Sequence, residues 1–339
     1  MSRVRSLVVS NATKMAASLG LVFLLTLCGC SKIQVGLGLR TSLAKVPVTS
    51  MEANLPKDPG VAPGEKSPLV VTFAASDGKT YVTEGKGKGK ILWKDLTITA
   101  TVVSINKNGI VSLDRDPRIS ESKIGHLAIT IPSHPGVTTE LDIPVRYDYP
   151  FVSNFSGTVG SSGSNGSDGI DGTGGMAGSL DPDNPSPGGN GTNGSNGTDG
   201  QDGGPGSEGP PVQIRVALRS GTHPLLQVGI TAPGHKQRLY LVDPQGGSLT
   251  VRSNGGPGGS GGQGGHGGRG GSGGIGSPNG QNGSDGSNGR DGNAGSPGRD
   301  GSITVTYDPQ AKPFLTAIHL PDKNGPPPVF TEASVASLW

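Results

Sequence analysis

Residues 255–276 read GGPGGSGGQGGHGGRGGSGGIG, a run in which Gly-Gly-x repeats seven times. Glycine also recurs at every third position in residues 157–178, 188–209 and 280–301, so that each of the four blocks holds eight glycines in register. A period of three is typical of a polyproline-II-type helix, which would make each block ~70 Å long at a rise of ~3.1 Å per residue. The equal block lengths argue against random low complexity and predict four ordered legs.

The blocks are joined in pairs by segments that favour turns. Residues 179–187 and 277–279 are rich in Pro, Asn, Asp and Ser, and both break the glycine register. Each pair of blocks is therefore predicted to form a hairpin whose bare glycine faces let neighbouring backbones approach and hydrogen bond. Because residues 255–276 are bare on two of three faces, we expect this block at the centre of a four-leg bundle.

The glycine periodicity resembles two known groups of proteins. One comprises the springtail glycine-rich antifreeze protein and certain phage tail-tip adhesins, which bundle polyglycine-II-type helices within one chain. The other comprises bacterial collagen-like proteins, whose Gly-X-Y helices combine three chains. Only Pro205, Pro257 and Pro297 occupy X or Y positions here, whereas collagen typically needs ~15–20% proline. We expect a monomeric bundle, with a collagen-like trimeric stalk or disorder as alternatives.

The amino-terminal residues predict export and lipidation. A basic start precedes an apolar run, residues 15–27, that is too short to span a bilayer but suits a signal peptide. Residues 27–30, Leu-Cys-Gly-Cys, resemble the bacterial lipobox. The resemblance implies cleavage of residues 1–29 and acylation of Cys30 by diacylglycerol and a further chain such as palmitate. An ordinary secretory signal or a short uncleaved anchor is the alternative.

The same resemblance implies a location and a partner. Ser31 after the modified cysteine favours the outer membrane, so we expect a cell-envelope protein held by its lipid anchor and facing the periplasm or the exterior. The mature chain then has one cysteine, Cys30, which is acylated, so no disulfide is expected. The net charge of +2 gives no basis for binding nucleic acid.

The rest of the chain predicts an all-β fold. Short segments with alternating apolar residues flank both hairpins, and they favour an antiparallel sandwich. The fold class expected is one or more β-sandwiches with two inserted glycine-rich hairpins and no substantial helix after the signal peptide. The clearest predicted strands are 69–73, 80–83, 91–103, 110–113, 127–131, 141–147, 212–218, 238–243, 249–252 and 303–307.

The domain boundaries follow from these patterns. The region after the tether resembles a bacterial immunoglobulin-like sandwich. A phrase after each exit strand, Pro224–Val228 and Pro313–Ala317, suggests a degenerate internal repeat. The predicted segments are 30–66, lipidated cysteine and flexible tether; 67–150, sandwich; 151–211, first hairpin; 212–254, second β base; 255–301, second hairpin; and 302–339, closing strands and Pro-rich tail.

No catalytic constellation or cofactor motif is evident. The six histidines are not spaced as metal ligands, and no serine lies in a nucleophile elbow. The first hairpin is acidic, and Asp181, Asp183 and Asn184 in its turn are weak candidates for a calcium site. The alternation of Gly and Lys in residues 84–90 lacks the spacing of a phosphate-binding loop and is read as a solvated turn.

These observations favour a structural or adhesive surface protein whose rods present the turns 179–187 and 277–279 to a surface, glycan or protein. No enzyme activity and no cofactor are expected. Ice binding is an alternative that the mixed polar side chains disfavour. A carbohydrate-processing enzyme is a further alternative, which would need carboxylates that converge in a pocket.

Overall fold

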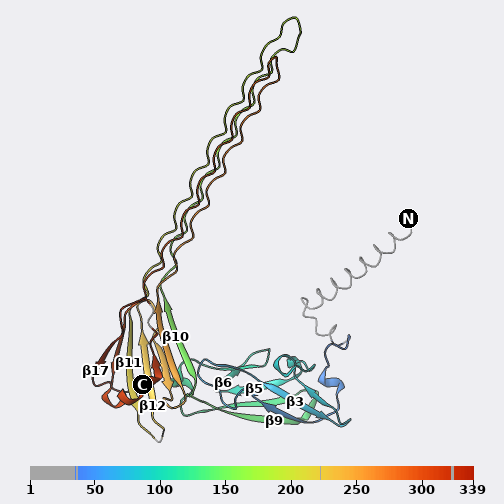
Figure 1. The fold of residues 1–339 in the computed structure, drawn as a ribbon. Coiled ribbons are helices and arrows are strands. Elements are labelled where there is room, and N and C mark those ends of the chain that lie inside the picture. Colours follow the sequence, from blue (N-terminus) through green and yellow to red (C-terminus); the bar gives the residue numbers. More distant parts are fainter. Residues whose placement is uncertain (1–34, 36, 222, 322–323) are drawn as a thin grey trace. The chain divides into compact units, whose positions relative to one another are not determined.

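The computed structural model describes residues 35, 37–221, 223–321 and 324–339. Cys30 and the predicted signal peptide lie outside these residues. The regular secondary structure of the described chain is mostly β-strand, which confirms the predicted all-β class (Figure 1). It divides into two compact units, Met1–Tyr147 and Asp148–Trp339. No helix in the described part is both long and apolar enough to cross a membrane.

The first unit contains three antiparallel sheets of three strands each. Alternate side chains of their strands point inward, and Phe73, Leu127 and Ile129 are fully buried in a shared apolar core. The strand orders are β1 (Val48–Asn54), β3 (Val70–Ala75), β4 (Thr80–Val82); β2 (Lys66–Pro68), β7 (Ile110–Leu113), β6 (Val103–Ile105); and β5 (Thr97–Thr101), β8 (Ile124–Ile131), β9 (His134–Pro144). Single turns of helix interrupt them at η1 (Leu43–Lys45), η2 (Gly85–Gly87), η3 (Trp93–Asp95) and α3 (Pro117–Ser120).

The prediction of a flexible tether over residues 30–66 is wrong from about residue 41 onward, where the chain is part of the folded first unit. β1 pairs with β3 along its length, and the side chains of Leu43 and Val61 are completely buried. The Pro and Gly residues that suggested a flexible tether instead form turns between buried apolar side chains. The sequence of β1, Val-Thr-Ser-Met-Glu-Ala-Asn, has few large apolar residues, so it lacks the clear apolar alternation by which a strand is predicted.

The second unit has a base of two sheets. The larger follows the order β13 (Arg238–Val242), β12 (Leu225–Thr231), β11 (Val212–Arg219), β15 (Ile303–Tyr307), β17 (Val329–Glu332), and the smaller follows β10 (Pro150–Ser156), β14 (Ser248–Asn254), β16 (Ile318–His319). Only the β11–β12 and β12–β13 pairs are antiparallel. The other pairs in both sheets are parallel, so the antiparallel pairing predicted for these strands is wrong.

The parallel pairing follows from the two hairpins. β10 and β14 both lead into an outgoing leg, whereas β11 and β15 both receive a returning leg (Figure 1). Because the hairpins extend side by side in the same direction, strands with the same role run the same way and pair with each other. The strand that enters the first hairpin is β10, not the predicted 141–147, whose first residues belong to β9.

The two copies of the predicted internal repeat have different secondary structures. Residues 224–228 enter strand β12, but their counterpart 313–317 lies in the 3-10 helix η4 (Pro309–Ala317). The Asp308 side chain accepts a hydrogen bond from the Gln310 N–H and caps this helix. The similarity is therefore confined to sequence, because both copies begin with a proline but only the first leads into a strand.

Candidate functional site: the glycine rod and its tip

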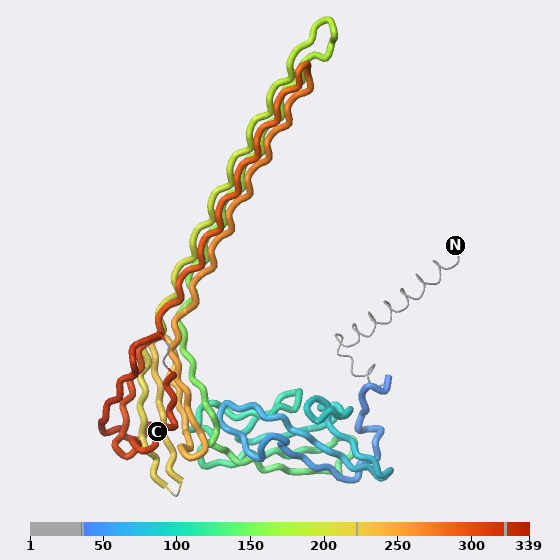
Figure 2. Tube along the Cα trace, in the orientation of Figure 1, coloured from blue at the N-terminus to red at the C-terminus, as the bar shows by residue number. Residues whose placement is uncertain are grey.

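The four glycine blocks lie side by side as a rod (Figure 2). We call them leg 1 (157–178), leg 2 (188–209), leg 3 (255–276) and leg 4 (280–301). Backbone hydrogen bonds of 2.6–3.0 Å join legs 1 and 2, 1 and 3, 2 and 3, 2 and 4, and 3 and 4. Each set recurs every third residue, as three residues per helical turn require.

The rod continues the pairing of the base without a break. β10 and β14 remain in register up to Ser156 and Asn254. The next hydrogen bond, from the Gly157 N–H to the Asn254 carbonyl at 2.9 Å, begins the set between legs 1 and 3. The returning legs enter β11 and β15, which are also in register with each other. The base therefore fixes the relative position of all four legs.

Glycine is required in the legs by close approach, and backbone conformation is not the reason. Every positive φ recorded for glycine lies outside the legs. A Cβ on Gly264 would clash with the carbonyl of Gly289 in leg 4, and a Cβ on Gly265 would clash with the carbonyl of Ser167 in leg 1. The two glycines in each triplet of leg 3 thus allow close approach of two different legs, as the sequence predicted for a central leg.

Leg 2 is equally central, which the sequence did not predict. Its glycine N–H groups donate to leg 4, as Gly197 does to Ser287. Its second residues donate to leg 1, and their carbonyls accept from leg 3, as Thr198 does from Gly265. Legs 2 and 3 therefore each contact all three other legs, while no hydrogen bond joins described residues of legs 1 and 4. Leg 2 keeps side chains because these point outward beside leg 1 or leg 4.

The Asn and Asp side chains of the rod satisfy backbone N–H groups that the legs leave without a carbonyl. In legs 1, 2 and 4 all of these side chains except Asn293 directly precede a glycine, and each Oδ1 at that position accepts a hydrogen bond from an amide on a neighbouring leg. Examples are Asn196 with the Ser287 N–H at 2.8 Å and Asp168 with the His266 N–H at 2.7 Å. The other residues at this position whose side chains cap an amide of a neighbouring leg are Asn165, Asp171, Asn190, Asn193, Asp199, Asp202, Asn282, Asp285, Asn288, Asp291 and Asp300.

Hydroxyl groups of leg 2 complete the pattern on leg 1. The Thr198 Oγ1 accepts from the Ser167 N–H at 2.7 Å, and the Ser195 Oγ accepts from the Ile170 N–H at the same distance. The polar side chains of the Gly-x-x triplets thus add lateral hydrogen bonds to those that the backbones of the legs make with one another. The acidic character of the first hairpin follows largely from this capping role.

The proposed calcium ligands form a local turn. The Asp181 Oδ1 accepts from the Asp183 N–H at 3.0 Å, and the Asn184 N–H donates to the Asp181 carbonyl at 3.1 Å. Across the described residues, no group of three His, Cys, Asp or Glu side chains is arranged to hold a metal ion. The Asp181 side chain and the backbone N–H groups of Asp183 and Asn184 therefore fold the turn, which carries no further argument for a cation.

The tip of the rod exposes apolar side chains. Met176 is 87% exposed, Leu180 is 65% exposed and Ile275 is 64% exposed. The Gly178 N–H donates to the Ile275 carbonyl, which brings the ends of legs 1 and 3 together. Figure 2 shows the first turn, in yellow-green, projecting beyond the second. A large exposed apolar side chain has no role in rod packing, so this group is a candidate contact surface.

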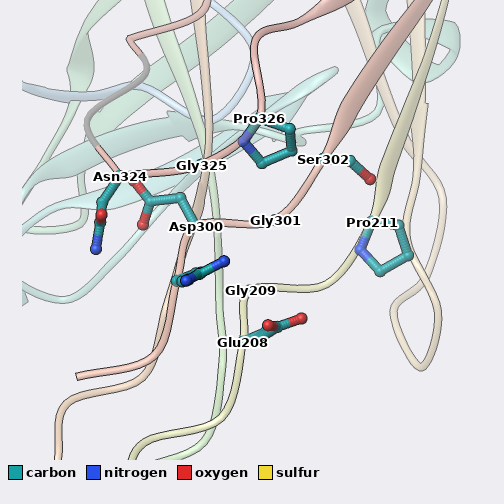
Figure 3. Close-up of a pocket in the computed structure, with 10 residues that line it drawn as sticks. Glu208, Gly209, Pro211, Asp300, Gly301, Ser302, Asn324, Gly325 and Pro326 are labelled. Atoms are coloured by element: carbon teal, nitrogen blue, oxygen red, sulfur yellow. The ribbon is translucent and has the colours of Figure 1, made fainter. Parts of the chain in front are cut away.

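An open pocket lined by both polar and apolar groups lies where the returning legs meet the base (Figure 3). Its lining includes Glu208, Asp300 and Asn324, but the two carboxylates point in different directions. The Asp300 Oδ1 already accepts from the Gly255 N–H at 2.9 Å. The pocket therefore does not bring together the acid and base that glycoside hydrolysis uses.

Comparison with protein-family models, with curated proteins and with solved structures found no match to this chain. A functional assignment therefore depends on the residues and geometry described above.

Proposed function

We propose that this protein is a lipid-anchored structural or adhesive protein of the bacterial cell envelope. Cys30 carries the lipid, and the glycine rod presents its two turns to a surface, glycan or protein outside the cytoplasm. Two observations support the proposal. The legs of the rod are hydrogen-bonded to one another along their length, and exposed apolar side chains lie at its tip.

The rod suits display because its legs hold one another in place. Each central leg is bonded to three neighbours, so bending the rod would break several hydrogen bonds in register. These bonds are made within one chain, which favours a monomer over a collagen-like trimer. A leg of this length extends ~70 Å at the rise of a polyproline-II helix, which is farther than a small domain reaches.

The tip suits contact because it differs in chemistry from the shaft. The side chains of the shaft are mostly Ser, Thr, Asn and Asp, many of which cap neighbouring amides, and the exposed apolar residues Val159 and Ile170 are exceptions. Met176, Leu180 and Ile275 instead leave apolar surface in water, which burial against a partner would remove at ~25 cal/mol per Å². We therefore expect the tip to bind a partner that offers apolar surface.

Attachment tests the adhesive part of the proposal. Beads coated with the protein through its amino end are assayed for retention on polystyrene and on hydrophilic glass. We expect retention on polystyrene to fall at least tenfold when Met176, Leu180 and Ile275 are all changed to Ser. A matched control changes Val159 and Ile170, exposed apolar residues of the shaft, to Ser. Equal loss in the control, or none in the tip variant, contradicts the proposal.

Labelling tests the anchor separately. Cells that produce the full chain are grown with labelled palmitate, and the protein is then partitioned between detergent and water. We expect the parent to carry label and enter the detergent phase, whereas Cys30→Ser loses the label and remains in water. Cys28→Ser serves as the matched control and should behave like the parent. Label that survives Cys30→Ser would exclude this anchor.

A further inference from the structure

A basic and apolar patch lies in the first unit where the chain arrives from its amino end. The patch comprises the segment 37–40 and the loop 85–90, whose sequence is Gly-Lys-Gly-Lys-Gly-Lys. We infer that this patch rests on the anionic headgroups of the phospholipid surface beside the acyl anchor. The inference builds on the proposed lipid anchor, and it assigns a second membrane contact to the folded part of the protein.

The loop is fixed and directs its charges outward. Backbone hydrogen bonds tie it to β4 and its surroundings, from Gly89 to Thr83 at 3.1 Å and from Glu84 to Ile91 at 2.8 Å. A Cβ on Gly87 would lie 2.9 Å from the Val82 side chain, and one on Gly89 would clash with the Val82 carbonyl. Glycine is therefore required on the side that packs against β4, while all three lysines are exposed.

The lysine charges are not neutralised locally. The ammonium groups of Lys86 and Lys88 form no hydrogen bond or ion pair with any described residue, and among these residues the Lys90 Nζ bonds only to the Gly38 carbonyl, at 3.3 Å. The one acidic neighbour in the loop, Glu84, is paired with Arg40 at 2.8 Å. The loop therefore presents three uncompensated positive charges, which suit the phosphates of anionic lipids.

The amino-terminal segment is bound to this loop. The Thr41 N–H donates to the Lys90 carbonyl at 2.9 Å, and Thr41 forms a parallel β-bridge with Ile91. Beside it, Leu37 and Leu39 are 58% and 54% exposed. Exposed leucines next to lysines are the combination by which proteins bind the interface of a bilayer, apolar side chains inserted and cations at the headgroups.

The covalent chain sets how far this patch can be from the membrane. Seven peptide links join Cys30 to Leu37, and an extended chain spans at most ~3.6 Å per residue, or ~25 Å in all. The acyl chains of Cys30 would thus hold the patch within ~25 Å of the headgroups. Because one weak contact is strengthened by a second on the same molecule, the lysines need only modest affinity.

Vesicle binding of protein without lipid tests the patch independently of the anchor. The chain from residue 30 onward with Cys30→Ser is mixed with vesicles of phosphatidylethanolamine and phosphatidylglycerol, or of phosphatidylcholine alone, and sedimented. We expect binding to the anionic vesicles only, weakened by added salt. Changing Lys86, Lys88 and Lys90 to Gln should lower this binding about a hundredfold, at about fivefold per lysine.

Two further variants complete the test. Lys66, Lys107 and Lys123, exposed elsewhere in the first unit, are changed to Gln as a matched control, and this variant should bind within about twofold of the parent. Changing Leu37 and Leu39 to Ser should lower binding at high salt, where the lysines contribute least. Absence of binding by the parent, or equal loss in both lysine variants, overturns the inference even if Cys30 is acylated in cells.

Discussion

The sandwich of the first unit and the glycine rod of the second are stabilised by different physical means. The sandwich buries large side chains such as Phe73 and Leu127 completely, so the removal of apolar surface from water is its main stabilisation. The rod buries mainly glycine, and its cohesion comes from backbone hydrogen bonds between legs and from Asn, Asp, Ser and Thr caps. One chain can therefore contain two ordered regions, one stabilised by an apolar core and the other lacking such a core.

The largest effect is expected in the apolar core. Phe73→Ala should lower the free energy of unfolding of the first unit by about 3–5 kcal/mol, because it leaves a cavity among packed side chains. Trp93, in the same core, reports this unfolding by its fluorescence when Trp339 is replaced by Phe. Ile124→Ala, at a 62% exposed position, is the control and should change the value by less than about 0.5 kcal/mol. Loss of rod order in F73A would contradict independent stabilisation.

The next largest effect is expected inside the rod. Gly265→Ala places a methyl group against the Ser167 carbonyl, so legs 1 and 3 must separate at a cost of about 1–3 kcal/mol or more. Limited proteolysis should then cut within residues 157–209 or 255–301, which stay resistant in the parent. Gln263→Ala adds no contact because its side chain is exposed, and it should remain resistant. Equal resistance in both variants would mean that the legs are not tightly packed.

A pH effect is expected in the first unit. Burial raises the pKa of Glu65, but the Ala62 N–H at 3.0 Å, together with Lys57 and Arg146, outweighs burial and holds its pKa below the usual value. This contribution to stability is complete above the unfolded pKa of about 4.3, and it is lost as pH falls through the lower folded value. Trp93 fluorescence in urea should therefore show stability that decreases below about pH 4.3.

Glu65→Gln gives the matched comparison. This variant should be about 1–3 kcal/mol less stable near neutral pH, because Lys57 and Arg146 lose a buried partner. Its stability should also decrease less on acidification. A parent and an E65Q variant with the same pH profile would show that Glu65 does not contribute in this way.

The smallest effect is expected for a single cap on the rod. Asn196→Ala removes the acceptor of the Ser287 N–H, and the expected loss is about 0.5–1.5 kcal/mol. Hydrogen exchange at the Ser287 amide should become faster. Asn196→Asp keeps an oxygen at the same position, as Asp199 does in the next triplet, and should exchange like the parent. Faster exchange in both variants would contradict the capping role.

The sequence allowed the rod to be predicted in more detail than the base. Period-three glycine and the two register breaks predicted the legs and their hairpins, because only close backbone packing needs glycine at such spacing. The capping role of Asn and Asp was missed, although a pattern was present: these residues precede the next glycine in legs 1, 2 and 4 and are absent from that position in leg 3. The sequence pattern was connected only with a calcium site in the turn, at Asp181, Asp183 and Asn184.

Parallel and antiparallel pairing could not be distinguished from the sequence, because the alternation of apolar and polar residues along a strand is the same in both. β11 and β15 have the same apolar pattern whether they pair in parallel or antiparallel. The direction is set by the hairpins, whose arrangement is a long-range property. Residues 43–61 were missed for another reason, since their buried side chains are spaced irregularly among turns. The exposed tip residues also carry no pattern, because exposure depends on where leg 1 ends relative to leg 3.

The shared register of the four legs constrains how such a protein can change its reach. Adding one triplet to a single leg would keep the three-residue period of hydrogen bonds, but it would displace the end of that leg by ~9 Å from its junction with the base or the turn. A change that keeps all four legs paired up to both ends must therefore insert one triplet in each leg, which lengthens the rod by the same ~9 Å. Relatives of different reach should accordingly differ in steps of twelve residues, divided equally among the legs.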